Sequence, residues 1–183
     1  MFAYDIKIPH ERIAVLIGSD GETKSRIEEQ TKTKIVIDSK EGDVNVSGKD
    51  AVLLYTAHHI VKAIARGFNP DVALRLLKQD WVFELIDLST YSTKKNHQQR
   101  LKGRVIGTRG RARAIIEELT DSSISVYGKT VGIIAPTETI GMAKQAVEDL
   151  LSGSQHAGVY KGLERKRRQL RMTQTLGTRP AKK

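Results

Sequence analysis

Residues 94–113 read KKNHQQRLKGRVIGTRGRAR, and this stretch decides the expected fold. It carries eight Lys or Arg residues and no acidic residue. The apolar pair at 105–106 leads into Gly107-Thr108-Arg109-Gly110, after which apolar residues recur at the i, i+3, i+4 and i+7 spacing of a helix face. The two glycines are therefore expected in a tight turn between two short helices. A missing Cβ there permits φ > 0 and the close approach of another backbone.

A Gly-x-x-Gly turn with a basic x between two helices resembles the KH module, whose loop clamps about four nucleotides of single-stranded RNA. The candidate RNA-binding residues are Gly107, Thr108, Arg109, Gly110, Arg111, Arg113, Arg104, Lys102, Ile106 and Ile124. Aromatic residues form only 5% of the chain, and none lies within 101–120. Bases are therefore expected to contact an aliphatic groove, which also includes Val105 and Ile115. The alternative is that the groove isoleucines belong to the core, and some are expected to do both.

The chain contains an internal repeat at an offset of 89 residues. Between 17–35 and 106–124, eight positions are identical, among them both glycines of the turn and an Ile-Glu-Glu sequence. Strand and helix patterns around both segments follow the order β-α-α-β-β-α, so the chain is predicted to be a tandem repeat of one module. The expected fold class is α+β, with two type I KH folds, each a three-stranded antiparallel sheet with three helices on one face.

The predicted organisation has four parts. Residues 1–68 form the first KH domain, 69–80 a connecting helix, 81–153 the second KH domain, and 154–183 a basic C-terminal extension. The first strand is expected at 4–8 and the second helix of the first module at 22–31. Asn69-Pro70 predicts the start of the connecting helix, because Asn is a preferred N-cap and Pro is favoured at N1.

The two predicted loops differ in charge. The loop of the first module contains Asp20 and is followed by Glu22, where the second module has Arg109 and Arg111. The second module is therefore predicted to be the main RNA binder, because a carboxylate repels a phosphate. Gly18, Ser19, Gly21 and Lys24 are secondary candidates, for weak RNA contact or for a structural or protein-docking role.

The net charge of +10 is unevenly distributed. Residues 1–69 carry ten basic and ten acidic residues, residues 70–151 twelve and ten, and residues 152–183 nine and one, so the balances are 0, +2 and +8. The extension is expected to begin as a helix and to end without fixed structure. Its basic residues either are simply solvated or form an arm that grips RNA phosphates: Arg165, Lys166, Arg167, Arg168 and Arg171.

Several other classes are disfavoured. No apolar run reaches 18 residues and the first 12 residues lack a signal-peptide core, which indicates a cytoplasmic protein without a membrane span. There is no cysteine, and the five histidines lack metal-ligand spacing. Gly128-Lys129-Thr130 lacks the first glycine of a P-loop and predicts a hairpin turn. We therefore expect no metal, no cofactor, no catalytic residue and no enzymatic activity.

Beyond the loop, three further segments resemble the archaeal members of a family of two-KH ribosome-assembly factors, the relatives of the partner-of-Nob and Dim proteins. They are the joint at 66–74, the segment at 80–85, and VYKGLE at 159–164. The resemblance implies binding to the 3′ region of small-subunit ribosomal RNA. It also implies a Nob-type endonuclease and the alpha subunit of initiation factor two as partners. Asp20 departs from a basic KH loop.

Two alternatives remain open at this point. One is a general mRNA-binding or exosome-associated KH protein, and the other is a protein-docking scaffold whose KH loops are vestigial. A monomer is expected in each case.

Overall fold

The computed structural model describes residues 2–177, with side chains through residue 173, and contains the predicted β-α-α-β-β-α order twice. The first module comprises β1 (Phe2–Lys7), α1 (His10–Ile17), η1 (Ser19–Gly21), α2 (Glu22–Thr31), β2 (Thr33–Asp38), β3 (Asp43–Gly48) and α3 (Ala51–Ala65). The second comprises β4 (Trp81–Asp87), η3 (Leu88–Thr90), α5 (Lys95–Ile106), η4 (Thr108–Gly110), α6 (Arg111–Thr120), β5 (Ser123–Tyr127), β6 (Thr130–Pro136) and α7 (Ile140–Leu151). The connector is α4 (Pro70–Ala73) with η2 (Leu74–Leu77), and α8 (His156–Gly177) follows the second module.

Each module has one three-stranded antiparallel sheet, with strand orders β1-β3-β2 and β4-β6-β5. The α+β prediction with two KH-type repeats is confirmed. The predicted first strand, at 4–8, is shifted: β1 pairs with β3 from Phe2 to Lys7. Ile8 has left the ladder, because its N–H donates instead to the carbonyl of Gly42 at 2.8 Å.

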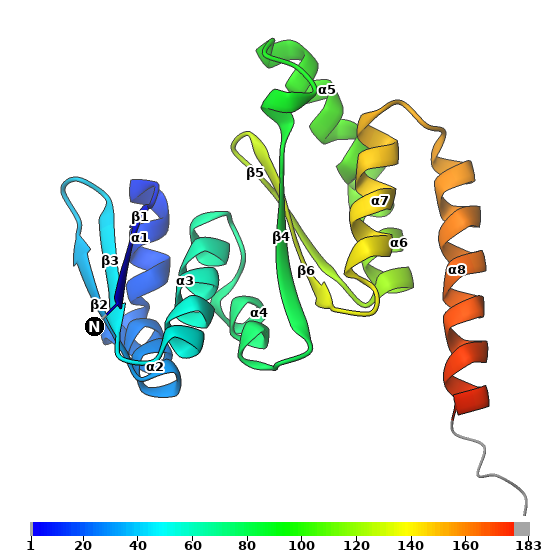
Figure 1. Cartoon of the computed structure of the whole chain (residues 1–183). Coiled ribbons are helices and arrows are strands. Elements are labelled where there is room, and N and C mark those ends of the chain that lie inside the picture. The colour runs from blue at the N-terminus through cyan, green and yellow to red at the C-terminus, as the bar shows by residue number, and fades with distance from the viewer. Residues whose placement is uncertain (1, 178–183) are drawn as a thin grey trace, which may run out of the picture.

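The two modules stack in the same direction (Figure 1). From one end of the molecule to the other, the layers are the first sheet, the helices of the first module, the second sheet, α5 to α7, and finally α8. The second sheet is therefore covered on both faces. As a result, β6 is buried from Thr130 to Ala135 without the alternation that a one-sided sheet would give.

One apolar contact lies at the centre of the junction between the modules. The ring of Phe68 packs on Gly132 in the central strand β6, where a Cβ would lie 2.7 Å from its Cε2 atom. Phe68 also meets Phe83 of β4 edge to face, with ring centroids 6.0 Å apart. Glycine weakens a strand, but here it provides the space for an aromatic ring from the other module. The core of the first module consequently continues through the connector into the second sheet.

Polar contacts at this junction come from the side chains of β5 that point away from α5 to α7. The Ser125 hydroxyl donates to the Arg66 carbonyl at 2.9 Å, and the Tyr127 hydroxyl donates to the Glu11 carboxylate. Gly67 lies between these groups with φ +95°, and a Cβ on it would be 2.7 Å from the Ser125 hydroxyl. The junction is thus held by contacts from several separate segments.

The connector starts where the sequence predicts. The Asn69 side chain accepts from the N–H of Asp71 at 3.0 Å, and Pro70 occupies the first helical position. The helix changes to 3-10 geometry after Ala73. Ala73 and Leu74 are buried in the same core cluster as α3, so the connector packs as part of the first module.

Within the described residues, the extension after the second module is a helix that packs on that module and not a free arm. Helix α8 packs against α6 and α7, and its Val159 and Leu163 side chains are buried in the core of the second module. The end predicted to lack fixed structure includes residues 178–183, which lie outside the described residues. None of the helices within residues 2–177 combines the length and apolar character that a membrane span requires.

Candidate nucleic-acid interface

The Gly-x-x-Gly loop of the second module is a tight turn with three left-handed residues. Gly107 ends α5 at φ 72° and ψ 175°, Arg109 has φ 54°, and Gly110 has φ 76°. The turn closes on itself by two hydrogen bonds, from Gly107 N–H to the Gly103 carbonyl and from Gly110 N–H to the Gly107 carbonyl. Arg109 therefore occupies a conformation that side chains rarely adopt, and its side chain is exposed at the tip.

The two glycines serve different purposes. A Cβ on Gly107 would lie 2.5 Å from the Cβ of Ala112 and 2.7 Å from its backbone nitrogen, so the close packing of α5 against α6 excludes any side chain there. A Cβ on Gly110 would meet nothing within 4 Å. Gly110 instead leaves the start of α6 open to a molecule approaching from outside.

The start of α6 is suited to an anion. The first backbone N–H groups of a helix lack intrahelical acceptors, and the helix dipole places partial positive charge there. Gly110 is the N-cap residue and supplies no side-chain acceptor for these groups. The exposed Thr108, Arg109, Arg111 and Arg113 surround them with a hydroxyl and three guanidinium groups. A phosphate is the ligand that this arrangement fits best.

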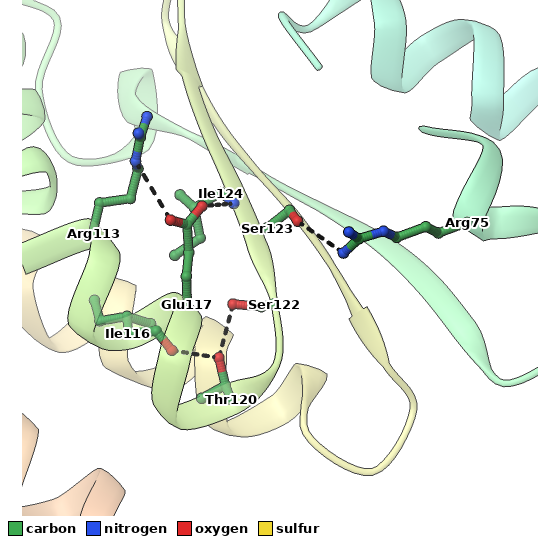
Figure 2. Close-up of polar contacts among 8 residues, drawn as sticks. All are labelled: Arg75, Arg113, Ile116, Glu117, Thr120, Ser122, Ser123 and Ile124. Carbon is green, nitrogen blue, oxygen red and sulfur yellow. Dashed lines mark hydrogen bonds and ion pairs between the residues drawn. The ribbon is translucent and has the colours of Figure 1, made fainter. Parts of the chain in front are cut away.

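The structure places the predicted aliphatic groove only partly at the surface. Ile106 and Ile115 are partly exposed, whereas Val105 is fully buried and Ile124 is 4% exposed. Figure 2 shows that the Glu117 carboxylate accepts from the backbone N–H of Ile124 at 2.7 Å, which fixes α6 against β5. Ile124 is therefore a core residue beneath the groove.

The same carboxylate orients one of the predicted basic residues (Figure 2). Arg113 Nε lies 3.7 Å from Glu117 Oε2, one helical turn away, and the pair is partly exposed. Such a pair contributes little to stability, about 0.3–0.5 kcal/mol. It does hold the guanidinium on the side of α6 that faces β5.

Arg104 is placed differently from the other predicted arginines. Its guanidinium donates to the carbonyls of Leu150 at 2.7 Å and Ser154 at 2.5 Å, at the C-terminal end of α7. In the first module, Arg12 donates in the same way to the carbonyls of Ile64 and Phe68. Arg104 therefore ties α5 to the end of α7, where its charge also complements the helix dipole. Lys102 is partly exposed on α5 and has no ion-pair partner among the described residues.

The loop of the first module repeats the backbone geometry with opposite charge. Gly18, Asp20 and Gly21 have φ values of 75°, 51° and 81°, each within 5° of its counterpart in the second module. Ser19 and Asp20 are exposed at the tip, and Lys24 is partly buried on α2. Geometry is thus common to both loops, and charge is the difference between them.

The predicted basic residues of the extension lie on α8. Arg165, Lys166, Arg168 and Arg171 are exposed, and Arg167 donates to the carbonyl of Glu118 at the end of α6 at 2.9 Å. Arg167 therefore helps to fix α8 on the second module. The other four extend the positive surface along the outside of the molecule.

Two residues beside the loop are absent from the sequence-based prediction. His156 and Tyr160, one turn apart on α8, lie next to Gly107 and Arg111 and line a hollow there. The signal in the sequence was the apolar pair Val159 and Leu163, whose spacing predicts a helix face that packs on the second module. No set of three metal-ligating side chains comes together within the described part of the chain.

Comparisons with known proteins agree with this geometry. Residues 3–61 match the family model of the KH domain, and residues 82–168 match that of the eukaryotic type KH-domain (KH-domain type I). The KH domain-containing protein MJ0443 of Methanocaldococcus jannaschii is 45% identical over 170 residues, which cover 91% of this chain and 74% of that protein.

Two further proteins carry more specific names. The pre-rRNA-processing protein PNO1 of Chaetomium thermophilum is 32% identical over 110 residues, which cover 56% of this chain but only 41% of that protein. A chain in the solved a/eIF2alpha-aDim2p-rRNA complex from Pyrococcus horikoshii OT3 is 45% identical, with a TM-score of 0.85 and coverage of 92% of this chain and 95% of that one.

The fold and the paired glycine loops define a tandem type I KH protein, a class that binds RNA. Within that class, the chain belongs to one family with the archaeal KH domain-containing protein MJ0443 and the archaeal proteins called Dim2p, and its second module matches the type I KH-domain model over residues 82–168.

The different purposes of the two glycines can be tested by unfolding in urea. Gly107→Ala should lower the free energy of unfolding by about 2 kcal/mol or more, because a left-handed residue with a side chain costs about 1–2 kcal/mol and its Cβ also overlaps Ala112. Gly110→Ala should cost only about 1 kcal/mol, since its Cβ enters open space. Equal losses in the two variants would contradict the assignment.

Proposed function

We propose that this chain binds single-stranded RNA through the Gly107–Gly110 loop, near the 3′ end of small-subunit ribosomal RNA, during maturation of the small subunit. The observation that carries the proposal is an open helix start surrounded by Thr108, Arg109 and Arg111. It is supported by the PNO1 relative named for pre-rRNA processing and by the similarity to a chain in a complex with rRNA.

Different residues of the second module would make different contacts with the RNA. The loop amides, Thr108 and Arg109 hold phosphates, while Arg111 adds charge on the side of α6 that faces α8 and Arg113 on the side that faces β5. Ile106 and Ile115 form the rim of a groove for bases, with Ile124 beneath it. Lys102 adds long-range attraction. Arg104 acts through its hydrogen bonds to α7, which hold α5 in place.

The second loop is the better binder on electrostatic grounds. At a separation of 4 Å, two unit charges interact by about 1–4 kcal/mol between bulk water and a protein surface. Attraction of this order between a phosphate and Arg109 or Arg111 favours binding at the second loop. Repulsion of the same order between a phosphate and Asp20 or Glu22 opposes binding at the first. The loop of the first module is therefore proposed as a docking surface for protein, with at most weak RNA contact through Ser19 and Lys24.

The proposed activity is binding without catalysis. The loop offers amides, a hydroxyl and guanidinium groups, which hold phosphates but supply no general base at neutral pH. We further propose that the chain works as a cytoplasmic monomer. Its partners would be the alpha subunit of initiation factor two, as in the rRNA complex described above, and a Nob-type endonuclease.

The site assignment is tested by placing two carboxylates in the loop. Thr108→Asp with Arg109→Asp should weaken binding of single-stranded RNA tenfold or more, because the new charges repel the phosphates. The thermal transition should not change, since both side chains are exposed and Asp tolerates a left-handed conformation. Fluorescence anisotropy with a labelled oligonucleotide from the 3′ end of small-subunit rRNA measures the affinity.

A matched control exists in the first module. Ser19→Asp produces the same Gly-Asp-Asp-Gly loop there and should leave RNA affinity within about twofold of the unmodified protein. If the two variants lose affinity equally, the assignment to the second module is wrong. RNA affinity unchanged in the Thr108 and Arg109 variant would favour the docking scaffold with vestigial loops. Sequencing RNA crosslinked in cells distinguishes ribosomal RNA from the mRNA of a general or exosome-associated KH protein.

A contribution of α8 to phosphate binding is measurable from the salt dependence. Arg165→Gln with Arg168→Gln removes two exposed charges and leaves the buried Val159 and Leu163 in place. Each phosphate contact with a single strand contributes about −0.7 to the log–log slope of affinity against salt, so the slope should become shallower by about 1.4. Lys40→Gln with Lys49→Gln is the control of equal charge. An equal slope in the two double variants would show that these arginines do not touch RNA.

The proposed oligomeric state and partner can be checked together by size-exclusion chromatography with light scattering. The chain alone should elute as a monomer. Mixed with the purified alpha subunit of initiation factor two, it should elute as a one-to-one complex. A dimer in the first experiment, or separate peaks at micromolar concentrations in the second, would remove that part of the proposal.

A further inference from the structure

A hollow of about 670 Å³ opens on the side of the Gly107–Gly110 loop that faces α8. It is lined by Gly103 of α5, by Gly107 and Thr108 of the loop, by Arg111 at the start of α6, and by Tyr160 of α8. We refer to this space as the α8 hollow. Its volume lies within the range of about 300–1,000 Å³ that is usual for small-ligand sites. It lies on the opposite side of α6 from the contact between Glu117 and β5.

The charges around the α8 hollow favour an anion. Its lining includes three arginines, at 100, 104 and 111, and no acidic residue among the described residues that form it. Arg104 is engaged by carbonyls of the chain. Arg100 and Arg111 are exposed, and within the described part of the chain neither forms an ion pair. Two guanidinium groups are therefore available to a ligand.

An aromatic ring stands beside these charges. Tyr160 is partly exposed, and its ring packs at an angle of 61° against that of His156, with centroids 6.1 Å apart. The His156 ring is fixed in turn by a hydrogen bond of 2.8 Å between its Nε2 atom and the Arg104 carbonyl. Burial raises the pKa of the Tyr160 hydroxyl, while the nearby Arg111 charge opposes this effect. The ring is thus a neutral, supported surface on which a base can stack.

Gly103 leaves the wall of the hollow that α5 forms without a side chain. Glycine is the least favourable residue inside a helix after proline, and Gly103 has no left-handed conformation that would require it. A Cβ at this position would meet nothing within 4 Å. The packing of the chain therefore does not explain the glycine, in contrast to Gly107. The missing Cβ leaves room for a ligand to come close to the α5 backbone.

We propose that the α8 hollow binds one further nucleotide of the RNA strand held by the Gly107–Gly110 loop. The base stacks on Tyr160, and the phosphate lies between Arg100 and Arg111. Thr108 lines both the loop and the hollow, so a strand bound at the loop reaches the hollow without leaving the protein surface. This inference rests on the proposed function, and it extends the binding site beyond the four nucleotides that a KH loop clamps.

The test uses the full chain and two lengths of labelled RNA, oligouridylate and oligoadenylate of four and eight nucleotides. Gly103→Gln fills the hollow while improving helix propensity, so this variant should be at least as stable as the unmodified protein. It should bind the eight-nucleotide strands roughly fivefold or more weakly and the four-nucleotide strands unchanged. Tyr160→Ala should give the same pattern, and Tyr160→Phe should retain full affinity because its ring still stacks.

Gly141→Gln is the matched control, because Gly141 lies on helix α7, does not line the hollow, and also has open space where a Cβ would be. It should not change the affinity for either length. The inference is overturned if Gly103→Gln and Tyr160→Ala bind eight nucleotides as well as the control does, or if they weaken both lengths equally. If the unmodified chain binds neither length, nor the oligonucleotide from the 3′ end of small-subunit rRNA, the proposed function fails as well. If only Thr108→Asp with Arg109→Asp weakens binding, the hollow alone is rejected.

Discussion

The close approach of Gly107 to Ala112 is the constraint on which the binding surface depends. A Cβ on Gly107 would lie only 2.5 Å from the Cβ of Ala112. The two helices α5 and α6 can therefore pack this closely only because the first residue of the turn is glycine. The tight turn then forces Arg109 into a left-handed conformation at the exposed tip and leaves the start of α6 uncapped. Packing in the interior therefore determines how the loop presents its charges.

The two modules show how a repeated backbone can acquire separate roles. Both modules keep the same contacts at the end of the helix that follows the turn: Thr31 and Thr120 each donate to a carbonyl one turn earlier, and Glu28 and Glu117 each accept from a backbone N–H of the following strand. These residues are identical at the offset of 89. The exposed residues of the two loops differ instead, with Ser19 and Asp20 in the first module and Thr108 and Arg109 in the second. The shared contacts therefore maintain the fold, and the loop residues determine the charge that each loop presents.

Much of the fold could be predicted because its signals are local. Periodicity, the cap at Asn69 and the repeated glycines gave the element order, and α2 has the predicted bounds. Contacts between residues about fifty positions apart gave no such signal. The sequence could not reveal that Arg104 binds the end of α7, which of the predicted groove residues are buried, or that α8 brings Tyr160 beside the loop. Those placements depend on how the helices pack.

The packing of Phe68 on Gly132 links the two repeats through their interiors. The residue at the end of one repeat fills a gap in the central strand of the next, so a cut between the repeats would leave an aromatic ring in water and a hole in a sheet. The core of the first repeat therefore ends inside the sheet of the second, and the two repeats are joined through shared side-chain packing as well as through the connector.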